Sequence, residues 1–176
     1  MPPQIHNHHH PNMLSVEDAL SKILDAFSVL EPVSSRVTDS LGMVISRDIL
    51  SDIDIPPTDN SAMDGYAVRS KDIENATVHS PVFLDVISTL AAGDIASVSI
   101  GSGTSIRIMT GAPIPEGADA VVPFEETTEM DQEISDSKRE IGIKHYVPPK
   151  TYIRNRGSDI KNRDIVLISG TKITPP

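Results

Sequence analysis

Three short segments of this 176-residue chain combine turn-forming residues with side chains that could do chemistry. The first spans residues 56–67, where two prolines precede Asp, Asn and Ser residues and Asp64-Gly65 predicts a tight turn into a strand. A carboxylate in such a turn is held in place and remains reachable, so Asp64 is a candidate functional residue. A hairpin turn stabilised by a local side-chain contact would have the same sequence.

The second segment, residues 107–123, leads from a predicted strand into a loop rich in Gly and Pro. Thr110 and Gly111 could present a hydroxyl and backbone N–H groups to an anion there. The lysine of a P-loop and the glycine pattern of dinucleotide-binding folds are both missing, which argues against nucleotide binding in either of these modes. A purely structural turn, whose prolines prevent pairing at a strand edge, is the alternative.

The third segment, residues 152–163, places four basic residues around Asp159. Arg154 and Arg156 are among them, and the planar guanidinium group suits oxyanions better than an ammonium group does. A solvated, charged turn would have the same composition, so both interpretations stay open.

Composition excludes several classes of function. No Cys is present, which rules out a disulfide scaffold, a thiolate zinc site and a Cys nucleophile. The formal net charge of −10 disfavours binding to nucleic acids and anionic membrane surfaces. The charge changes sign along the chain, because residues 125–140 carry seven acids and two bases whereas residues 141–176 carry seven bases and two acids.

Since no apolar run could span a membrane and no signal peptide is evident, we expect a cytoplasmic protein without membrane insertion.

One helix near the N-terminus is expected to be the longest regular element. Ser15 is a candidate N-cap with Asp18 as its capping-box partner, and apolar residues at helical spacing predict a helix from Ser15 to Glu31, ended by Pro32. Residues 1–12 are rich in His, Pro and Asn, and we expect them to be a disordered leader.

The rest of the chain predicts short strands, and the fold class is mainly β with one N-terminal amphipathic helix. Runs rich in β-branched residues, separated by turn formers, favour antiparallel sheets, and the lack of a second long helix argues against a parallel βαβ architecture. A short helix is expected at residues 39–46, and the acidic residues 125–137 are expected to form an exposed hairpin loop that is not a binding site. Strands are expected at residues 33–37, 66–68, 82–87, 105–109, 120–123, 141–145 and 165–168.

Taken in order, the three segments resemble the N-terminal region of the molybdopterin molybdotransferase family, the type of MoeA and of the gephyrin E-domain. The similarity covers about residues 13–174. Met63-Asp64 follows the bacterial pattern, since relatives of the gephyrin branch have Lys-Asp there. The motifs that carry the resemblance are Asn60-Ser-Ala-Met-Asp-Gly-Tyr-Ala67, Arg107-Ile-Met-Thr-Gly-Ala-Pro-Ile-Pro115, Gly117-Ala-Asp-Ala-Val-Val122 and, less specifically, Arg154 with Gly157-Ser158-Asp159-Ile160.

The resemblance implies two small lobes. Residues 13–58 and 156–176 would form an elongated, helix-bearing lobe, and residues 59–155 an inserted, β-barrel-like lobe. It further implies a homodimer through the elongated lobe. The α/β catalytic domain of the family is expected to be absent from this sequence, so the chain alone should be inactive.

The resemblance also implies a transferase of molybdenum-cofactor synthesis, which inserts molybdate into adenylylated molybdopterin and releases AMP with the help of Mg²⁺ or another divalent cation. Asp64 and Asp159 would be catalytic carboxylates that bind this cation. An alternative comes from the gephyrin branch, which also clusters membrane receptors and implies a scaffold that binds a protein partner. The residues expected to bind the anionic substrates are Thr110, Gly111, Arg154 and Arg156.

Overall fold

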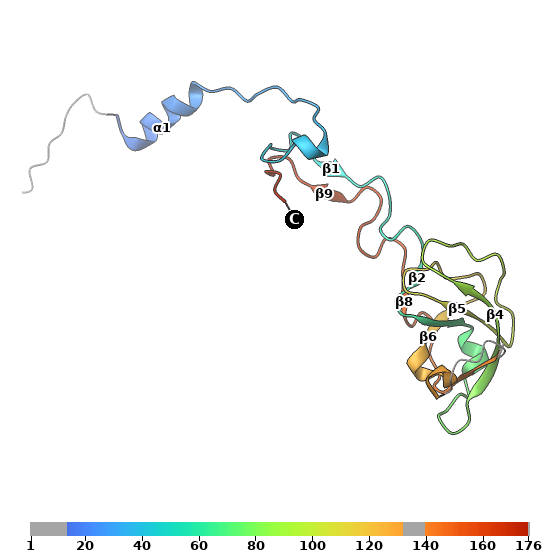
Figure 1. Ribbon diagram of the computed structural model, residues 1–176. Helices are drawn as coiled ribbons and strands as arrows, with labels where there is room; N and C mark the ends of the chain where they lie inside the picture. Colours follow the sequence, from blue (N-terminus) through green and yellow to red (C-terminus); the bar gives the residue numbers. More distant parts are fainter. Residues whose placement is uncertain (1–13, 132–139, 176) are drawn as a thin grey trace, which may run out of the picture. The chain divides into compact units, whose positions relative to one another are not determined.

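A computed structural model of the chain describes residues 14–131 and 140–175 (Figure 1). These residues are mainly β, with one α-helix among them. The chain divides into two compact units, of which unit 1 comprises residues 1–46 and 172–176 and unit 2 comprises residues 47–171. The unit boundaries differ from the lobe boundaries expected near residues 58 and 156, and the two-lobe division stays a prediction. The His-rich leader lies outside the described residues.

Unit 1 contains the predicted helix, α1 (Val16–Asp25). The Ser15 hydroxyl caps it by accepting a hydrogen bond from the backbone N–H of Asp18 at 3.0 Å, as the sequence predicts. The helix ends at Asp25 instead of Glu31, because apolar spacing alone does not fix the length of a helix that has no buried face. None of the residues of α1 is buried, so the apolar stripe predicted to face a core is exposed.

Two further predictions for unit 1 are wrong. The strand expected at residues 33–37 does not form. The chain has no regular structure up to Arg36, and a 3-10 helix, η1 (Val37–Asp39), follows. The helix expected from Asp39 to Ser46 does not form, since Gly42 adopts a left-handed conformation at φ 82° and Val44 makes an isolated bridge to Lys172.

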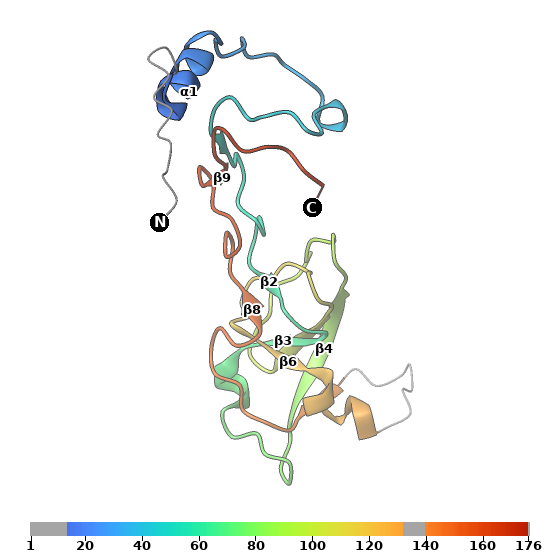
Figure 2. The ribbon, with the colours of Figure 1, turned by 90° about the vertical axis from the view of Figure 1, so that its left-hand side faces the viewer.

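Unit 2 is built on a five-stranded sheet in the order β6-β3-β5-β4-β7 (Figures 1 and 2). The sheet is open, with β6 and β7 at its edges, and curls into a half-barrel. Its strands are β3 (Gly65–Val68), β4 (Val82–Leu90), β5 (Thr104–Ile108), β6 (Ala120–Pro123) and β7 (Glu140–Ile143), each within a few residues of its predicted position.

One pairing in this sheet differs from the antiparallel pattern that the sequence predicts. Strands β4 and β5 are parallel, whereas β3–β5, β3–β6 and β4–β7 are antiparallel. A parallel pair needs a connection of about a dozen residues, and residues 91–103 supply it without a helix. The absence of a helical segment therefore does not exclude a parallel pair here.

Two short antiparallel ribbons complete unit 2 and follow one another along the two strands of chain that lead to the five-stranded sheet (Figures 1 and 2). One pairs β1 (Ile49–Leu50) with β9 (Ile165–Leu167), of which only β9 is predicted. The other pairs β2 (Asn60–Ser61) with β8 (Ile153–Arg154), and neither strand is predicted because two residues show no periodicity.

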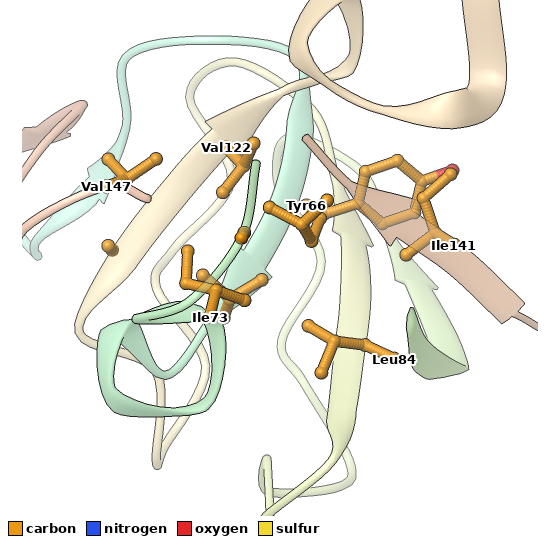
Figure 3. Close-up of a cluster of buried hydrophobic side chains, with 10 residues drawn as sticks. Tyr66, Ile73, Leu84, Val122, Ile141 and Val147 are labelled. Atoms are coloured by element: carbon orange, nitrogen blue, oxygen red, sulfur yellow. The ribbon is translucent and has the colours of Figure 1, made fainter. Parts of the chain in front are cut away.

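Alternate residues of β3 belong to two different hydrophobic clusters. Tyr66 and Val68 pack in one cluster with Ile73 from the 3-10 helix η2 (Ser70–Ile73), as Figure 3 shows. Ala67 belongs to the other cluster, which includes Ile106. Since side chains alternate between the faces of a strand, the sheet is packed on both faces, and β3 is the rigid element that begins directly after Asp64.

The acidic segment after β6 is more ordered than predicted. It forms two 3-10 helices, η3 (Phe124–Glu126) and η4 (Thr128–Asp131), and Thr127 between them is fully buried. The expectation of an exposed hairpin loop is therefore wrong for residues 125–131, while residues 132–137 lie outside the described residues. In the part of the chain that the structure describes, no helix is long and apolar enough to cross a membrane.

Candidate functional site

Strand β2 joins the three segments that the sequence singles out. The N–H of Ser61 donates to the carbonyl of Ala112 at 2.9 Å, and the carbonyl of Ser61 accepts from the N–H of Gly111 at 2.9 Å. On its other edge β2 pairs with β8, and the N–H of Ala62 donates to the carbonyl of Tyr152 at 2.9 Å. Backbone hydrogen bonds therefore bring the three segments to one place in unit 2.

Asp64 and Thr110 form the tightest contact in this region. Both the backbone N–H and the hydroxyl of Thr110 donate to Oδ1 of Asp64, each at 2.7 Å. These bonds, with a smaller contribution from the positive charge of Arg107, lower the pKa of the Asp64 carboxyl below its ordinary value. Among the described residues no donor contacts Oδ2 of Asp64, so one carboxylate oxygen is held and the other is available to a ligand.

Arg154 and Asp159 form a second pair. The guanidinium Nη2 of Arg154 lies 2.6 Å from Oδ2 of Asp159, and about half of each side chain is exposed. This hydrogen bond, supported by one from the Ser158 hydroxyl, lowers the pKa of Asp159. Within the described residues no hydrogen bond or ion pair joins this pair to Asp64 and Thr110.

Arg156 is held by two carboxylates that sequence reasoning missed. Its Nε lies 2.6 Å from Oδ2 of Asp54, and its backbone N–H donates to Oδ1 of Asp59 at 2.7 Å. Hydrogen bonds from Asn162 N–H and from Arg156 lower the pKa of Asp54. The alternation of Asp and Ile around Asp54 suggests a solvated face, but the side chain of Asp54 is only 15% exposed.

The hydrogen-bond donors of Thr110 and Gly111, which were expected to bind an anion, already bind other residues of this chain. Both donors of Thr110 bind Asp64, and the N–H of Gly111 binds the Ser61 carbonyl. Gly111 adopts φ 83°, a conformation that glycine reaches without strain. An anion could use these donors only by displacing those bonds, so the anion-binding role of Thr110 and Gly111 stays a prediction. Within residues 14–131 and 140–175, no carboxylate contacts the remaining guanidinium nitrogens of Arg154 and Arg156.

A third cluster lies next to Asp64 and was not predicted. The Tyr66 hydroxyl donates to Oε2 of Glu129 at 2.7 Å, and Nη2 of Arg107 lies 2.9 Å from Oε1 of the same carboxylate. Burial, followed by the Glu129 contact, raises the pKa of Tyr66 to about 12. The hydrogen bond that Arg107 donates to Glu129 raises the pKa of Arg107. No local signal in an acidic, Ser/Thr-rich stretch distinguishes Glu129 from its exposed neighbours.

The donor set offers limited support for a protein-bound cation. The described residues contain no group of three or more Asp, Glu, His or Cys side chains that could hold a metal ion. Mg²⁺ commonly keeps several waters and takes only one or two carboxylates together with substrate phosphate. Oδ2 of Asp64 fits such a role, whereas Asp159 is already bound to Arg154.

Comparison with known proteins identifies the family of this chain. Residues 14–176 match the family model described as the MoeA N-terminal region (domain I and II). Molybdopterin molybdenumtransferase 2 of Mycobacterium tuberculosis is 34% identical over 163 residues, which cover 93% of this chain and 38% of that protein. Molybdopterin molybdenumtransferase of Staphylococcus epidermidis is 36% identical over 160 residues, which cover 91% of this chain and 36% of that protein.

A solved structure shows the same fold. The crystal structure of the molybdopterin biosynthesis moeA protein from Pyrococcus horikoshii OT3 matches with a TM-score of 0.79 and 32% identity, over 90% of this chain and 40% of that one. The chain thus spans well under half the length of the relatives that it matches. Because the family model matches residues 14–176, the chain belongs to the MoeA N-terminal region family (domain I and II).

Proposed function

We propose that this chain serves as the N-terminal region of a molybdotransferase, which inserts molybdate into adenylylated molybdopterin with release of AMP. The observation that carries the proposal is the convergence of three segments on β2, which brings a held carboxylate and two arginines into one region. Relatives named molybdopterin molybdenumtransferases support it. Because the chain spans only 38% of such a relative, we infer that a further part of the protein completes the substrate site.

In this proposal the arginines bind the anionic groups of the substrates. The guanidinium groups of Arg154 and Arg156 each donate one hydrogen bond to a carboxylate and keep further N–H groups for molybdate or for the phosphate of the adenylylated pterin. Binding of an anion to Arg154 would release Asp159 from its ion pair. Asp159 would then be free to position a water molecule or to share a cation with the substrate.

Asp64 is the residue proposed to hold a divalent cation such as Mg²⁺. A divalent cation bound there would neutralise charge on the phosphate oxygens as AMP departs. Thr110 holds Oδ1 of Asp64 through two bonds, which orients Oδ2 and keeps the carboxylate ionised. Thr110 therefore acts on Asp64, and its contact with the substrate would require the hydroxyl to turn away from Oδ1.

We also propose that unit 1 mediates homodimerisation. In α1 and the segment after it, Leu24, Phe27, Val29 and Leu30 are 61 to 97% exposed. Such a run of exposed apolar side chains is costly in water and marks a surface that another protein covers. The same observation is compatible with a scaffold role toward a different protein, and sedimentation at several concentrations separates the two, since only self-association depends on the concentration of this chain alone.

The decisive test uses the gene product that carries this region and measures cofactor insertion by D64N, T110A and D159N. Each variant is expected to lose insertion while its melting temperature changes little, because the three side chains make surface contacts only. D85N is the matched control, since Asp85 is exposed on β4 and its side chain forms no hydrogen bond or ion pair with the described residues. Full activity in D64N and D159N would contradict the proposed site, and the chain of 176 residues alone is expected to show little or no turnover.

A further inference from the structure

The cluster of Tyr66, Arg107 and Glu129 has no role in the function proposed above. Glu129 lies on η4 and its side chain is only 14% exposed, while that of Arg107 on β5 is 31% exposed. Both carboxylate oxygens of Glu129 are used, one by the Tyr66 hydroxyl and one by the Arg107 guanidinium. Two bonds to different oxygens fix the carboxylate, and with it the position of the guanidinium.

The strand register places Arg107 next to Asp64. Strands β3 and β5 are antiparallel with Gly65 opposite Ile108 and Tyr66 opposite Arg107. Continuing this register by one residue puts Asp64 opposite Met109, so that Arg107 is its diagonal neighbour on the same face. Diagonal neighbours across an antiparallel pair are about 7–8 Å apart at the backbone, which is within reach of a long side chain.

From this position the guanidinium of Arg107 could compete with a divalent cation for the carboxylate of Asp64. Without Glu129, Arg107 would be a partly buried charge lacking a partner, and Asp64 is the acid nearest to it in the register. Its free oxygen, Oδ2, is also the one that Thr110 leaves without a donor. An ion pair between Arg107 and Asp64 would therefore block the coordination of a cation.

We propose that Glu129 is a positioning residue that holds Arg107 away from Asp64 and so keeps Oδ2 of Asp64 available to a divalent cation. The inference rests on the cation role of Asp64 in the proposed function. It assigns a purpose to Glu129, whereas the side chains of Glu125 and Glu126 form no hydrogen bond or ion pair in the described part of the chain.

The test measures binding of Mn²⁺ to the full chain by the electron paramagnetic resonance signal of the free ion. E129Q is expected to bind Mn²⁺ about two- to fivefold more weakly, the range that a partly exposed ion pair supports. E129D keeps the charge but is one methylene shorter, so it should also bind more weakly if position matters. E125Q is the matched control, because it removes one charge from an exposed side chain nearby, and it should bind Mn²⁺ like the wild type.

The double variant E129Q/R107M removes the competitor and is expected to regain wild-type affinity or better. Wild-type affinity in both E129Q and E129D would overturn the proposal, and so would a crystal structure of E129Q in which Arg107 stays away from Asp64. If E129Q does not fold, E129D decides, because its shorter side chain should hold Arg107 less well and bind Mn²⁺ more weakly than the wild type, and equal affinity would refute the idea.

D64N separates this inference from the proposed function. Equal Mn²⁺ affinity in D64N and the wild type would refute the cation role of Asp64, and the positioning role of Glu129 would fall with it. Loss of affinity in D64N with unchanged affinity in the Glu129 variants would overturn the positioning role alone.

Discussion

Substitution of Gly65 by Ala is expected to destabilise unit 2 strongly. A Cβ at this position would lie 2.1 Å from the carbonyl oxygen of Val122 and 2.9 Å from Cα of Pro123. Both atoms belong to the backbone of β6, which pairs with β3 through this residue, so no side-chain rotation relieves the clash. The two strands would have to separate by about 1 Å, since unbonded carbon and oxygen atoms approach only to about 3 Å.

Overpacking that forces a backbone shift costs about 3 kcal/mol, at the upper end of the usual range. With an m-value of about 2 kcal/mol/M in urea, the unfolding midpoint should fall by about 1.5 M. Far-UV circular dichroism is the suitable probe, because the chain contains no Trp. G101A is the matched control, since the nearest atom to its added Cβ is the Thr104 hydroxyl at 4.0 Å, and its midpoint should change little. Equal midpoints for G65A and G101A would refute the close approach of β6 to β3.

Two pH-dependent effects follow from the shifted pKa values. Burial raises the pKa of Tyr66 from 10.0 to about 12, so its contribution to stability is complete below pH 10 and is lost as the pH rises through about 12. Urea midpoints should fall more steeply over this range in the wild type than in Y66F, and parallel curves would contradict the burial of the phenol. Hydrogen bonds lower the pKa of Asp54 below 3.8, so its contribution is present above that pH and is lost as the pH falls through the folded-state pKa. The wild type should be more stable than D54N at neutral pH and should lose this advantage in acid, and an advantage that persists in acid would contradict these hydrogen bonds.

The strands that could be predicted from the sequence are those whose residues pack on the sheet. The runs that form β4, β5 and β6 are rich in β-branched residues because their side chains fill the two clusters. Strands β2 and β8 have two residues each and owe their pairing to neighbouring turns, so no periodicity reveals them. The apolar spacing of α1 continues to Leu30, but no residue of the helix is buried, so the spacing alone does not show that the helix ends at Asp25.

The sequence predicted which segments form the candidate site but not the contacts between its side chains. Motif resemblance identified Asp64 and Thr110, and the structure brings them into contact. The sequence could not show that the donors of Thr110 are used by Asp64, because that depends on the β3–β5 register. It also could not distinguish Glu129 within an acidic stretch, since burial of one acid is decided by the distant residues Tyr66 and Arg107.

Backbone hydrogen bonds determine the geometry of the candidate site. We therefore expect substitutions of its side chains to affect binding, and substitutions that move the backbone to affect folding as well. Ser61 uses its N–H and its carbonyl to bind the second segment, and β2 pairs with the third segment along its other edge. The candidate side chains project from this backbone framework, and those of Thr110, Arg154 and Asp159 are exposed. Substitutions such as D64N should therefore change binding and leave stability nearly intact, whereas G65A, one residue away, should disturb both, because it displaces the strand that carries Asp64. A stability loss in D64N as large as that in G65A would show that the carboxylate, and not the backbone, holds the segments together.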